Sequence, residues 1–164
     1  MKNYICINGK KTELTSEQMR QLGIEPEKKN PFKRSEYGKW FYYISGNGIV
    51  GLTNDYNSEM DVDCFEAGNY CTDKSLMEQR ALHETLNRLL WRYSMENGGG
   101  EIDWDYNTKS KYFIYYDIQK RKLDISSFYI WKQDTIFFST RKIAESAIEE
   151  IIKPFMAKHP EFIW

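Results

Sequence analysis

The sequence has few of the residues and motifs that mark common functional classes. Its three cysteines are odd in number and irregularly spaced, so they do not make a disulfide framework and suit a reducing compartment. No apolar run approaches the roughly 20 residues of a membrane span, and the N-terminus lacks the apolar core of a signal peptide. The net charge is only -1, which argues against a general polyanion binder. We therefore expect a cytoplasmic protein without membrane association.

Motifs of established catalytic classes are also missing. The chain has no Gly-x-Ser-x-Gly elbow, no Walker loop, no His-Glu-x-x-His and no zinc-deaminase pattern. Residues 46–51 do match Gly-x-Gly-x-x-Gly, the fingerprint of dinucleotide-binding folds. That fingerprint needs a helix directly behind it to meet the pyrophosphate, and residues 52–55 carry no helical pattern. We therefore interpret the glycines as a hairpin turn, and expect a protein that is not an enzyme and needs no cofactor.

Metal-site patterns are incomplete. Six residues between Asp55 and Glu66 match the ligand positions of a calcium loop, but Met60 stands where the sharp turn needs glycine. The spacing of Cys64, Cys71 and His83 differs from the paired ligands of structural zinc sites. We expect no bound metal, although a cation in the acidic segment stays open.

Aromatic residues are abundant, at 16% of the chain. They favour pleated, half-buried surfaces and fill a core from few positions, so the aromatic runs 40–44 and 112–116 predict strands. The remaining expected elements of this region are, in order, a turn at 46–48, a strand at 49–52, an acidic loop at 55–63, a strand at 65–71, a turn at 119–122 and strands at 123–131 and 135–138.

Two apolar stripes with helical spacing predict helices. A leucine-rich stripe predicts a long helix that begins behind Asp73 and ends near Glu96, before three glycines. An isoleucine and alanine stripe over 143–152 predicts a helix capped by residue 139 or 140. Because proline has no amide donor, Pro154 should kink or end that helix.

The N-terminal part reads as a small appendage. Residues 4–8 predict a strand, and Asn8-Gly9 is a strong hairpin-turn signal. Thr15 and Gln18 have the spacing of a capping box for a short helix. Residues 25–39 are basic, contain two prolines and lack apolar periodicity, so they predict a linker.

We predict an α+β fold of antiparallel sheets with helices on one face. Residues 1–36 would form the hairpin, the short helix and the basic linker. Residues 37–100 and 101–164 would each form a unit of three strands and a helix, because the aromatic strands and the capped helices recur at a spacing of about 70 residues. Deleting residues 1–36 should then leave a part that folds cooperatively.

The segment between Asn54 and Asp73 contains six carboxylates and no Lys or Arg. Such an exposed surface can mimic phosphates and dock on a basic groove, with apolar side chains as anchors. As an exposed loop it should tolerate charge reversal. The competing interpretation is a merely solvated connection. The predicted partner-binding residues are Asp55, Glu59, Met60, Asp61, Asp63, Phe65 and Glu66.

An aromatic sheet with basic edges is the alternative site, because such sheets stack and steer single-stranded nucleic acid. The competing interpretation places these aromatics in the core and lets the lysines protect a sheet edge. The near-neutral charge makes direct nucleic-acid binding the less favoured function. The residues of this alternative face are Trp40, Tyr42, Tyr112, Tyr115, Lys120, Arg121 and Lys122.

Four segments carry the most characteristic local sequences: residues 1–15, 69–73 with the helix behind them, 135–140 and 153–164. Together they resemble small proteins encoded by phages and prophages of low-GC Gram-positive bacteria. The shared motifs are structural, so no catalytic residue is carried over. Small phage accessory proteins often inhibit host defence systems, including CRISPR effector nucleases. The resemblance therefore implies a non-enzymatic protein that binds a host protein, such as a nucleic-acid-binding defence enzyme.

Overall fold

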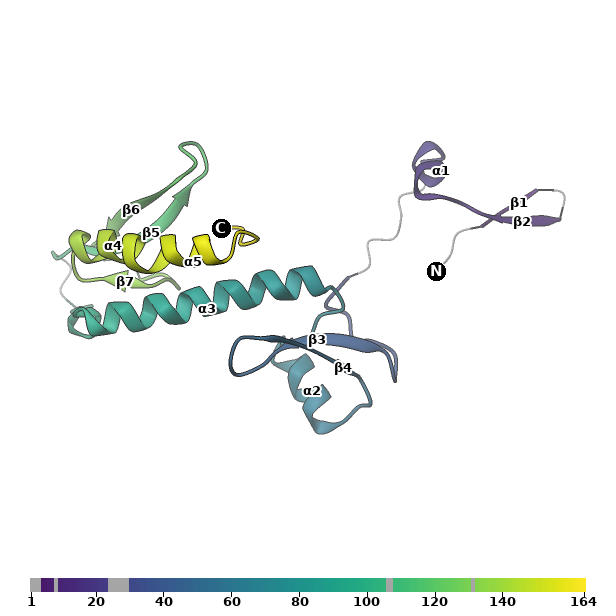
Figure 1. Cartoon of the computed structure of the whole chain (residues 1–164), viewed down its shortest axis with the longest axis horizontal. Helices are drawn as coiled ribbons and strands as arrows, with labels where there is room; N and C mark the ends of the chain where they lie inside the picture. The colour runs from purple at the N-terminus through teal and green to yellow at the C-terminus, as the bar shows by residue number, and fades with distance from the viewer. Residues whose placement is uncertain (1–3, 8, 24–29, 106–107, 131) are drawn as a thin grey trace. The chain divides into compact units, whose positions relative to one another are not determined.

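The computed structural model describes residues 4–7, 9–23, 30–105, 108–130 and 132–164, which form helices and antiparallel sheets as predicted (Figure 1). The chain divides into two units, Met1–Lys33 and Arg34–Trp164. Within the described residues, every helix falls short of the combination of length and apolar composition that a membrane span requires.

The smaller unit contains the predicted hairpin and short helix. Strands β1 (Tyr4–Ile7) and β2 (Lys10–Glu13) pair antiparallel. Asn8 of the predicted turn lies outside the described residues, as do Lys28 and Lys29 of the basic linker. Helix α1 (Ser16–Gln21) begins at the predicted capping box, in which the Thr15 hydroxyl and the Gln18 side chain accept hydrogen bonds from each other's backbone N–H.

The larger unit begins with the hairpin of β3 (Trp40–Ile44) and β4 (Val50–Asn54), in which Ile44 lies opposite Val50. The glycine-rich segment forms the turn between these strands, which confirms the hairpin interpretation. Gly48 has a φ of +82°, a left-handed conformation that favours glycine. No helix follows the turn, so the backbone lacks the geometry of a dinucleotide site.

The predicted acidic loop is wrong, because most of this segment is helix α2 (Glu59–Glu66). The helix begins at a capping box, Ser58 with Asp61, in which each side chain accepts from the other's backbone N–H. In the sequence, the alternating carboxylates at 59, 61 and 63 obscure the helical pattern of this segment. The capping box was therefore the local signal that could have predicted the helix.

The predicted strand at 65–71 is also wrong. Phe65 and Glu66 are the last residues of α2, and only Cys71 pairs with the hairpin, through a single antiparallel bridge to Tyr42. The side chain of Asn69 replaces part of the backbone pairing that a strand would make, because it hydrogen-bonds to both the N–H and the carbonyl of Ile44.

Helix α3 (Lys74–Glu96) is the predicted long helix, and the Asp73 carboxylate accepts from the backbone N–H of Leu76 as its cap. After its C-cap, Asn97, the chain forms the short 3-10 turn η1 (Gly99–Glu101). Helix α3 contacts β3 and β4 as well as α4. It therefore contributes to two clusters of buried residues, one with the first hairpin and one with the C-terminal elements.

The C-terminal elements form a three-stranded sheet with a helix against it. The strand order is β6 (Lys122–Phe128), β5 (Lys111–Asp117) and β7 (Phe137–Phe138). Thr140 caps α4 (Arg141–Ala147). The larger core cluster lies here and includes Leu86, Leu90, Ile125, Phe138, Ala144, Ala147, Ile152, Phe155 and Phe162.

Pro154 does not end the last helix. Helix α4 continues through η2 (Ile148–Ile152), a π-helical segment, into α5 (Lys153–Lys158). Pro154 sits in the first turn of α5, where a missing amide donor is tolerated. Just before Pro154, the wider π turn shifts the backbone hydrogen bonds relative to those of a regular α-helix. This shift lies where a regular helix would need the amide N–H that Pro154 lacks.

The duplicated plan of strands and helix stays a prediction. Strand β3 pairs with β4 and bridges to Cys71, and β5 pairs with β6 and β7. However, the described residues between β6 and β7 include no helix like α2, and the bridge at Cys71 is shorter than β7.

Candidate functional site

The predicted partner-binding segment is built around a buried carboxylate. Asp55, which directly follows β4, is only 1% exposed. Its Oδ2 accepts hydrogen bonds from Arg34 Nε at 2.8 Å and from the Tyr70 hydroxyl at 3.0 Å, and its Oδ1 accepts from Arg34 Nη2 at 3.0 Å and from the Asn57 N–H at 2.9 Å. This two-pronged contact is the strongest geometry available to a guanidinium and a carboxylate.

These partners keep Asp55 ionised. The hydrogen bond from Arg34, with smaller contributions from Asn57 and Tyr70, lowers the pKa of Asp55 to about 2, although burial acts in the opposite direction. The same ion pair raises the pKa of Arg34. Tyr70 is 1% exposed, and its ring stacks on Phe41 of β3 at 4.0 Å between centroids. The network therefore joins the segment before β3 to the chain on both sides of α2.

A second buried carboxylate fixes the start of α2. Asp61 is 3% exposed, and its Oδ2 accepts from the backbone N–H groups of Tyr56 and Ser58, both at 2.9 Å. Burial opposes the ionisation of Asp61, but the hydrogen bonds from the Ser58 hydroxyl and from these amides lower its pKa below the ordinary value. Negative charge here also lies at the helix N-terminus, where the helix dipole stabilises it.

Asp55 and Asp61 are therefore not part of an exposed acidic surface, contrary to the sequence prediction. Both carboxylates accept hydrogen bonds from donors within the protein. Charge reversal at either position would therefore break buried contacts and would not leave the fold intact. Arg34, Tyr70 and Ser58 position this part of the molecule, although from the sequence Arg34 was expected only to make the linker basic. Only the cap Ser58-x-x-Asp61 carried a local signal.

The remaining acidic residues form an exposed helix face. Glu59, Asp63 and Glu66 lie at helical spacings of four and three residues, so they project from one side of α2. All three are exposed, and none forms an ion pair with a described residue. Met60, next to this row, is 48% exposed. We call these four residues the acidic face.

Phe65 is less available than predicted. It is 37% exposed, but its ring packs edge-on against Tyr70 at 5.5 Å and lies 5.8 Å from the Arg34 guanidinium. It therefore supports the buried network, and Met60 is the apolar side chain that the acidic face offers.

The residues of the alternative nucleic-acid face do not form one platform. Trp40 and Tyr42 belong to the sheet of β3 and β4, and Tyr112 and Tyr115 to the sheet of β5, β6 and β7. Trp40 is exposed, whereas Tyr112 packs against the larger core cluster.

The basic tip of the second hairpin is partly neutralised. Lys120 forms ion pairs with Asp117 and Asp124, which raise its pKa. Arg121 and Lys122 are exposed, and Arg121 has a left-handed φ of +52° in the turn. The aromatic residues of this face therefore lie on two sheets and Lys120 is ion-paired, whereas Arg121 and Lys122 are exposed, so nucleic-acid binding here stays a prediction.

Metal ligands do not gather in the described part of the chain, where no group of three or more His, Cys, Asp or Glu side chains is placed to hold an ion. Helix α2 interrupts the calcium-loop spacing, and two of its six ligand positions, Asp55 and Asp61, are buried and bound by internal donors. Cys64 is half-buried and Cys71 buried, and neither belongs to such a group.

Comparisons of the chain with protein-family models, with curated proteins and with solved structures find no match.

Proposed function

We propose that this is a non-enzymatic binding protein of phage origin, which docks the acidic face of α2 on a basic surface of a host protein. The nucleic-acid-binding groove of a defence nuclease, such as a CRISPR effector, is a partner of the required chemistry. The observation that carries the proposal is the acidic face itself: three exposed carboxylates and Met60 on a helix whose start is locked by buried contacts.

The charge pattern supports a basic partner. Residues 40–73 contain no Lys or Arg, although the whole chain is almost neutral. Two arginines of the larger unit are already engaged, because Arg34 binds Asp55 and Arg80 binds Glu84. The negative field of the acidic face would speed encounters with a surface of opposite charge.

The buried hydrogen bonds of Asp55 and Asp61 would favour tight binding to a partner, because they also fix the position of α2. A helix that is ordered before binding loses little conformational entropy when it docks. Asp55 and Asp61 fix the chain at the start of α2 through four hydrogen bonds, and three more tie Asp55 to Arg34 and Tyr70. Met60, beside the row of carboxylates, can then enter an apolar pocket, while the carboxylates pair with Lys and Arg.

The test begins with a photo-crosslinking amino acid at position 60, expressed in a Gram-positive host, and the same label at Glu145 on the exposed side of α4 as a control. A host protein that crosslinks at position 60 and not at 145 is then purified. Its association kinetics are measured with the wild type and with the Glu59→Gln, Asp63→Asn, Glu66→Gln variant.

The matched control neutralises three exposed carboxylates elsewhere, at Glu96, Glu101 and Asp134, so that both variants have the same net charge. We expect the association rate at low salt to fall by about 5- to 10-fold for the acidic-face variant only, with a weaker salt dependence. Equal rates for the two variants, or a crosslinked partner with an acidic contact surface, would refute the proposal.

A further inference from the structure

The hairpin of β3 and β4 has two outer edges, and they differ in their hydrogen bonding. In an antiparallel pair, residues alternate between those whose backbone groups bond to the partner strand and those whose groups point away. The N–H of Asp55 donates to the carbonyl of Lys39, and the N–H of Ser45 to the carbonyl of Ile49, both at 2.9 Å. Odd-numbered residues therefore bond across the hairpin, and even-numbered residues of both strands point their N–H and C=O groups outward.

The outward groups of β3 have partners. The N–H of Tyr42 donates to the carbonyl of Cys71 at 2.7 Å, and the carbonyl of Tyr42 accepts from the N–H of Cys71 at 3.0 Å. The N–H and the carbonyl of Ile44 bond to the side chain of Asn69 at 2.7 and 2.8 Å. Another strand could therefore pair with β3 only by displacing these contacts.

The outward groups of β4 have no partner in the described part of the chain. Among those residues, no hydrogen bond reaches the backbone N–H or C=O groups of Val50, Leu52 and Asn54. The side chain of Leu52 is also 50% exposed. An unpaired strand edge is a template for another strand, and proteins usually protect it with charged residues, with proline or by keeping it very short.

The other outer strands of the larger unit follow this rule. Strand β6 carries Lys122 and Asp124, and β7 is only two residues long. Strand β4 has the sequence VGLTN, which contains no charge and no proline. The ring of Tyr43 covers its glycine, because a Cβ atom on Gly51 would lie 2.6 Å from that ring. Strand β4 is therefore a regular and unprotected edge.

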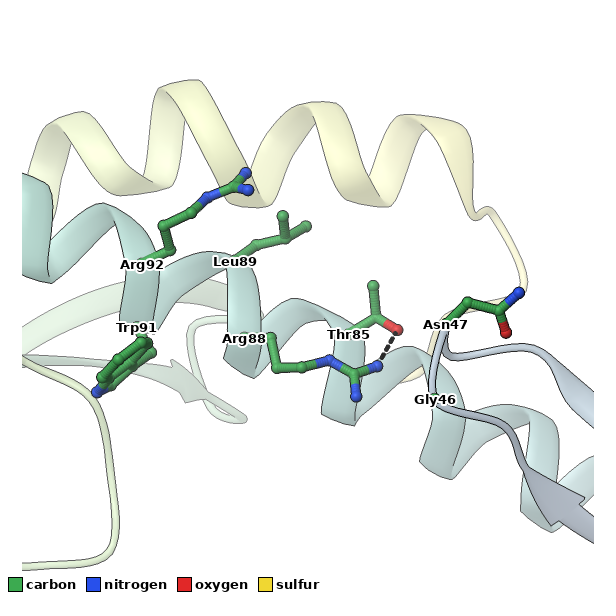
Figure 2. Close-up of a pocket in the computed structure, with 7 residues that line it drawn as sticks. All are labelled: Gly46, Asn47, Thr85, Arg88, Leu89, Trp91 and Arg92. Carbon is green, nitrogen blue, oxygen red and sulfur yellow. Dashed lines mark hydrogen bonds between the residues drawn. The ribbon is translucent and has the colours of Figure 1, made fainter.

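Both ends of β4 are held in place. The turn before it lies beside α3, where Asn47 and Thr85 line a common cavity (Figure 2). A Cβ atom on Gly48 would lie 2.8 Å from Thr85 Oγ1, so the turn approaches α3 as closely as glycine permits. At its other end, β4 leads directly into Asp55 and the buried ion pair with Arg34. An edge that is ordered before binding loses little conformational entropy when it pairs.

The surroundings of β4 indicate the chemistry of its partner. Leu52 would lie directly opposite a side chain of an added strand, and an apolar residue there forms a favourable cross-strand pair. Residues 40–73 contain six carboxylates and no Lys or Arg. A cavity of about 470 Å³ borders the first residue of β4, and its lining includes Glu78, Glu161, one lysine and His159. Lys or Arg near the ends of an added strand would therefore be attracted, and Asp or Glu repelled.

We propose that the free edge of β4 binds an extended segment of a partner protein as an added antiparallel strand, with apolar residues on the side of Leu52 and Lys or Arg at its ends. The backbone of the segment bonds to the outward groups of Val50, Leu52 and Asn54, which supplies affinity, and its alternating side chains supply selectivity. This contact is separate from the acidic face of α2 and does not depend on it.

The test titrates the 15N-labelled full-length protein with the peptide acetyl-Lys-Val-Thr-Val-Thr-Val-Lys-amide and follows the backbone amides by NMR. We expect saturable binding at or below millimolar concentration, which shifts the amide signals of Leu52 and Asn54 and protects them from hydrogen exchange. The amides of Gly51 and Thr53 already face β3, so their exchange should change little. This alternation does not depend on the folding of any variant.

Altered peptides separate backbone pairing from side-chain contacts. The valines on the side of Leu52 are the residues that bond to β4, because directly opposed residues share a face. N-methylation of two valines should therefore weaken binding by at least about 10-fold. The matched control, N-methylation of the two threonines, blocks N–H groups that point away from β4 and should weaken it by less than about 3-fold. Glutamate in place of both lysines should weaken it by at least about 3-fold.

Variants of the protein assign the contact to the edge. Leu52→Lys should weaken peptide binding by about 5-fold, because it replaces the apolar cross-strand contact with a charge. The matched control Ile118→Lys adds the same charge to a side chain that is 82% exposed, at the turn between β5 and β6. It should bind within about 2-fold of the wild type. Sedimentation equilibrium of the free wild type and of both variants tests whether a second copy of the chain occupies the edge.

Four results would overturn the proposal. The first is no binding of the lysine peptide at millimolar concentration, and the second is equal binding of the two N-methylated peptides. The third is equal binding of the glutamate and lysine peptides, or of the Leu52→Lys and Ile118→Lys variants. The fourth is a wild-type dimer that Leu52→Lys dissociates, because a second copy would then be the occupant.

Discussion

Replacing Asp55 by Asn tests whether a buried carboxylate organises the segment around α2. The substitution keeps the shape of the side chain and its ability to accept from the Asn57 N–H. It removes the negative charge that receives two hydrogen bonds from Arg34 and one from Tyr70. The Arg34 side chain is 28% exposed, so water can partly replace the lost partner.

The size of the effect follows from the pKa of Asp55. That pKa is about 2 in the folded chain, against an ordinary value of 3.8. A carboxyl group whose pKa is lower in the folded state stabilises the fold above the unfolded pKa and loses this contribution as the pH falls through the folded value. The difference corresponds to about 2 kcal/mol at pH 7 and about 1 kcal/mol at pH 3, and most of it is lost by pH 2.

Urea unfolding of the wild type and of Asp55→Asn at pH 7, 4 and 3 measures this directly. The wild type should be more stable by about 2–3 kcal/mol at pH 7, and the gap should narrow by about 1 kcal/mol at pH 3. Asp63→Asn, on the exposed side of the same helix, is the control and should change the free energy of unfolding by less than about 0.5 kcal/mol. A gap for Asp55→Asn that is constant with pH, or as small as the control's, would refute the reasoning.

Three further predictions concern the cap, the core and the division of the chain. Ser58→Ala removes the hydroxyl cap of α2 and should lower the free energy of unfolding by about 1 kcal/mol, measured by urea unfolding, whereas Ser58→Asp should restore most of it. Phe138→Ala opens a cavity in the larger core cluster and should cost about 3–5 kcal/mol, seen as a large drop in Tm; a loss under 1 kcal/mol would contradict its burial. A chain that begins at Arg34 should unfold cooperatively when its heat capacity is measured by calorimetry. A chain that begins at residue 37 should be less stable by about 2–3 kcal/mol because it lacks Arg34, and equal Tm values for the two chains would contradict this.

Elements with complete local signals could be predicted from the sequence. Helix α3 has a cap at Asp73, a leucine stripe and terminal glycines, and each of these acts within a few residues of chain. The two aromatic hairpins and the capping box of α1 are also short-range features. Such signals determine local conformation because the atoms that interact are close in sequence, whatever the rest of the chain does.

Of the two outcomes expected for Pro154, a kink or the end of the helix, the second is wrong. Proline should end a helix, but the π turn of η2 places it in the first turn of α5, where the missing donor has no cost. Packing of the isoleucine and alanine face into the larger core cluster keeps the chain helical on both sides. Tertiary contacts thus overrode a backbone preference that the sequence states clearly.

The candidate site depended on tertiary structure most of all. A row of carboxylates reads as a solvated surface, because burying an unpaired charge is costly. Whether Asp55 is paired depends on Arg34 and Tyr70, which are 21 and 15 residues away along the chain. Only the folded arrangement brings those donors to it, and so separates carboxylates that hold the molecule together from those left to face a partner. The sequence by itself determined which residues carry charge, and the tertiary structure decided which charges are exposed.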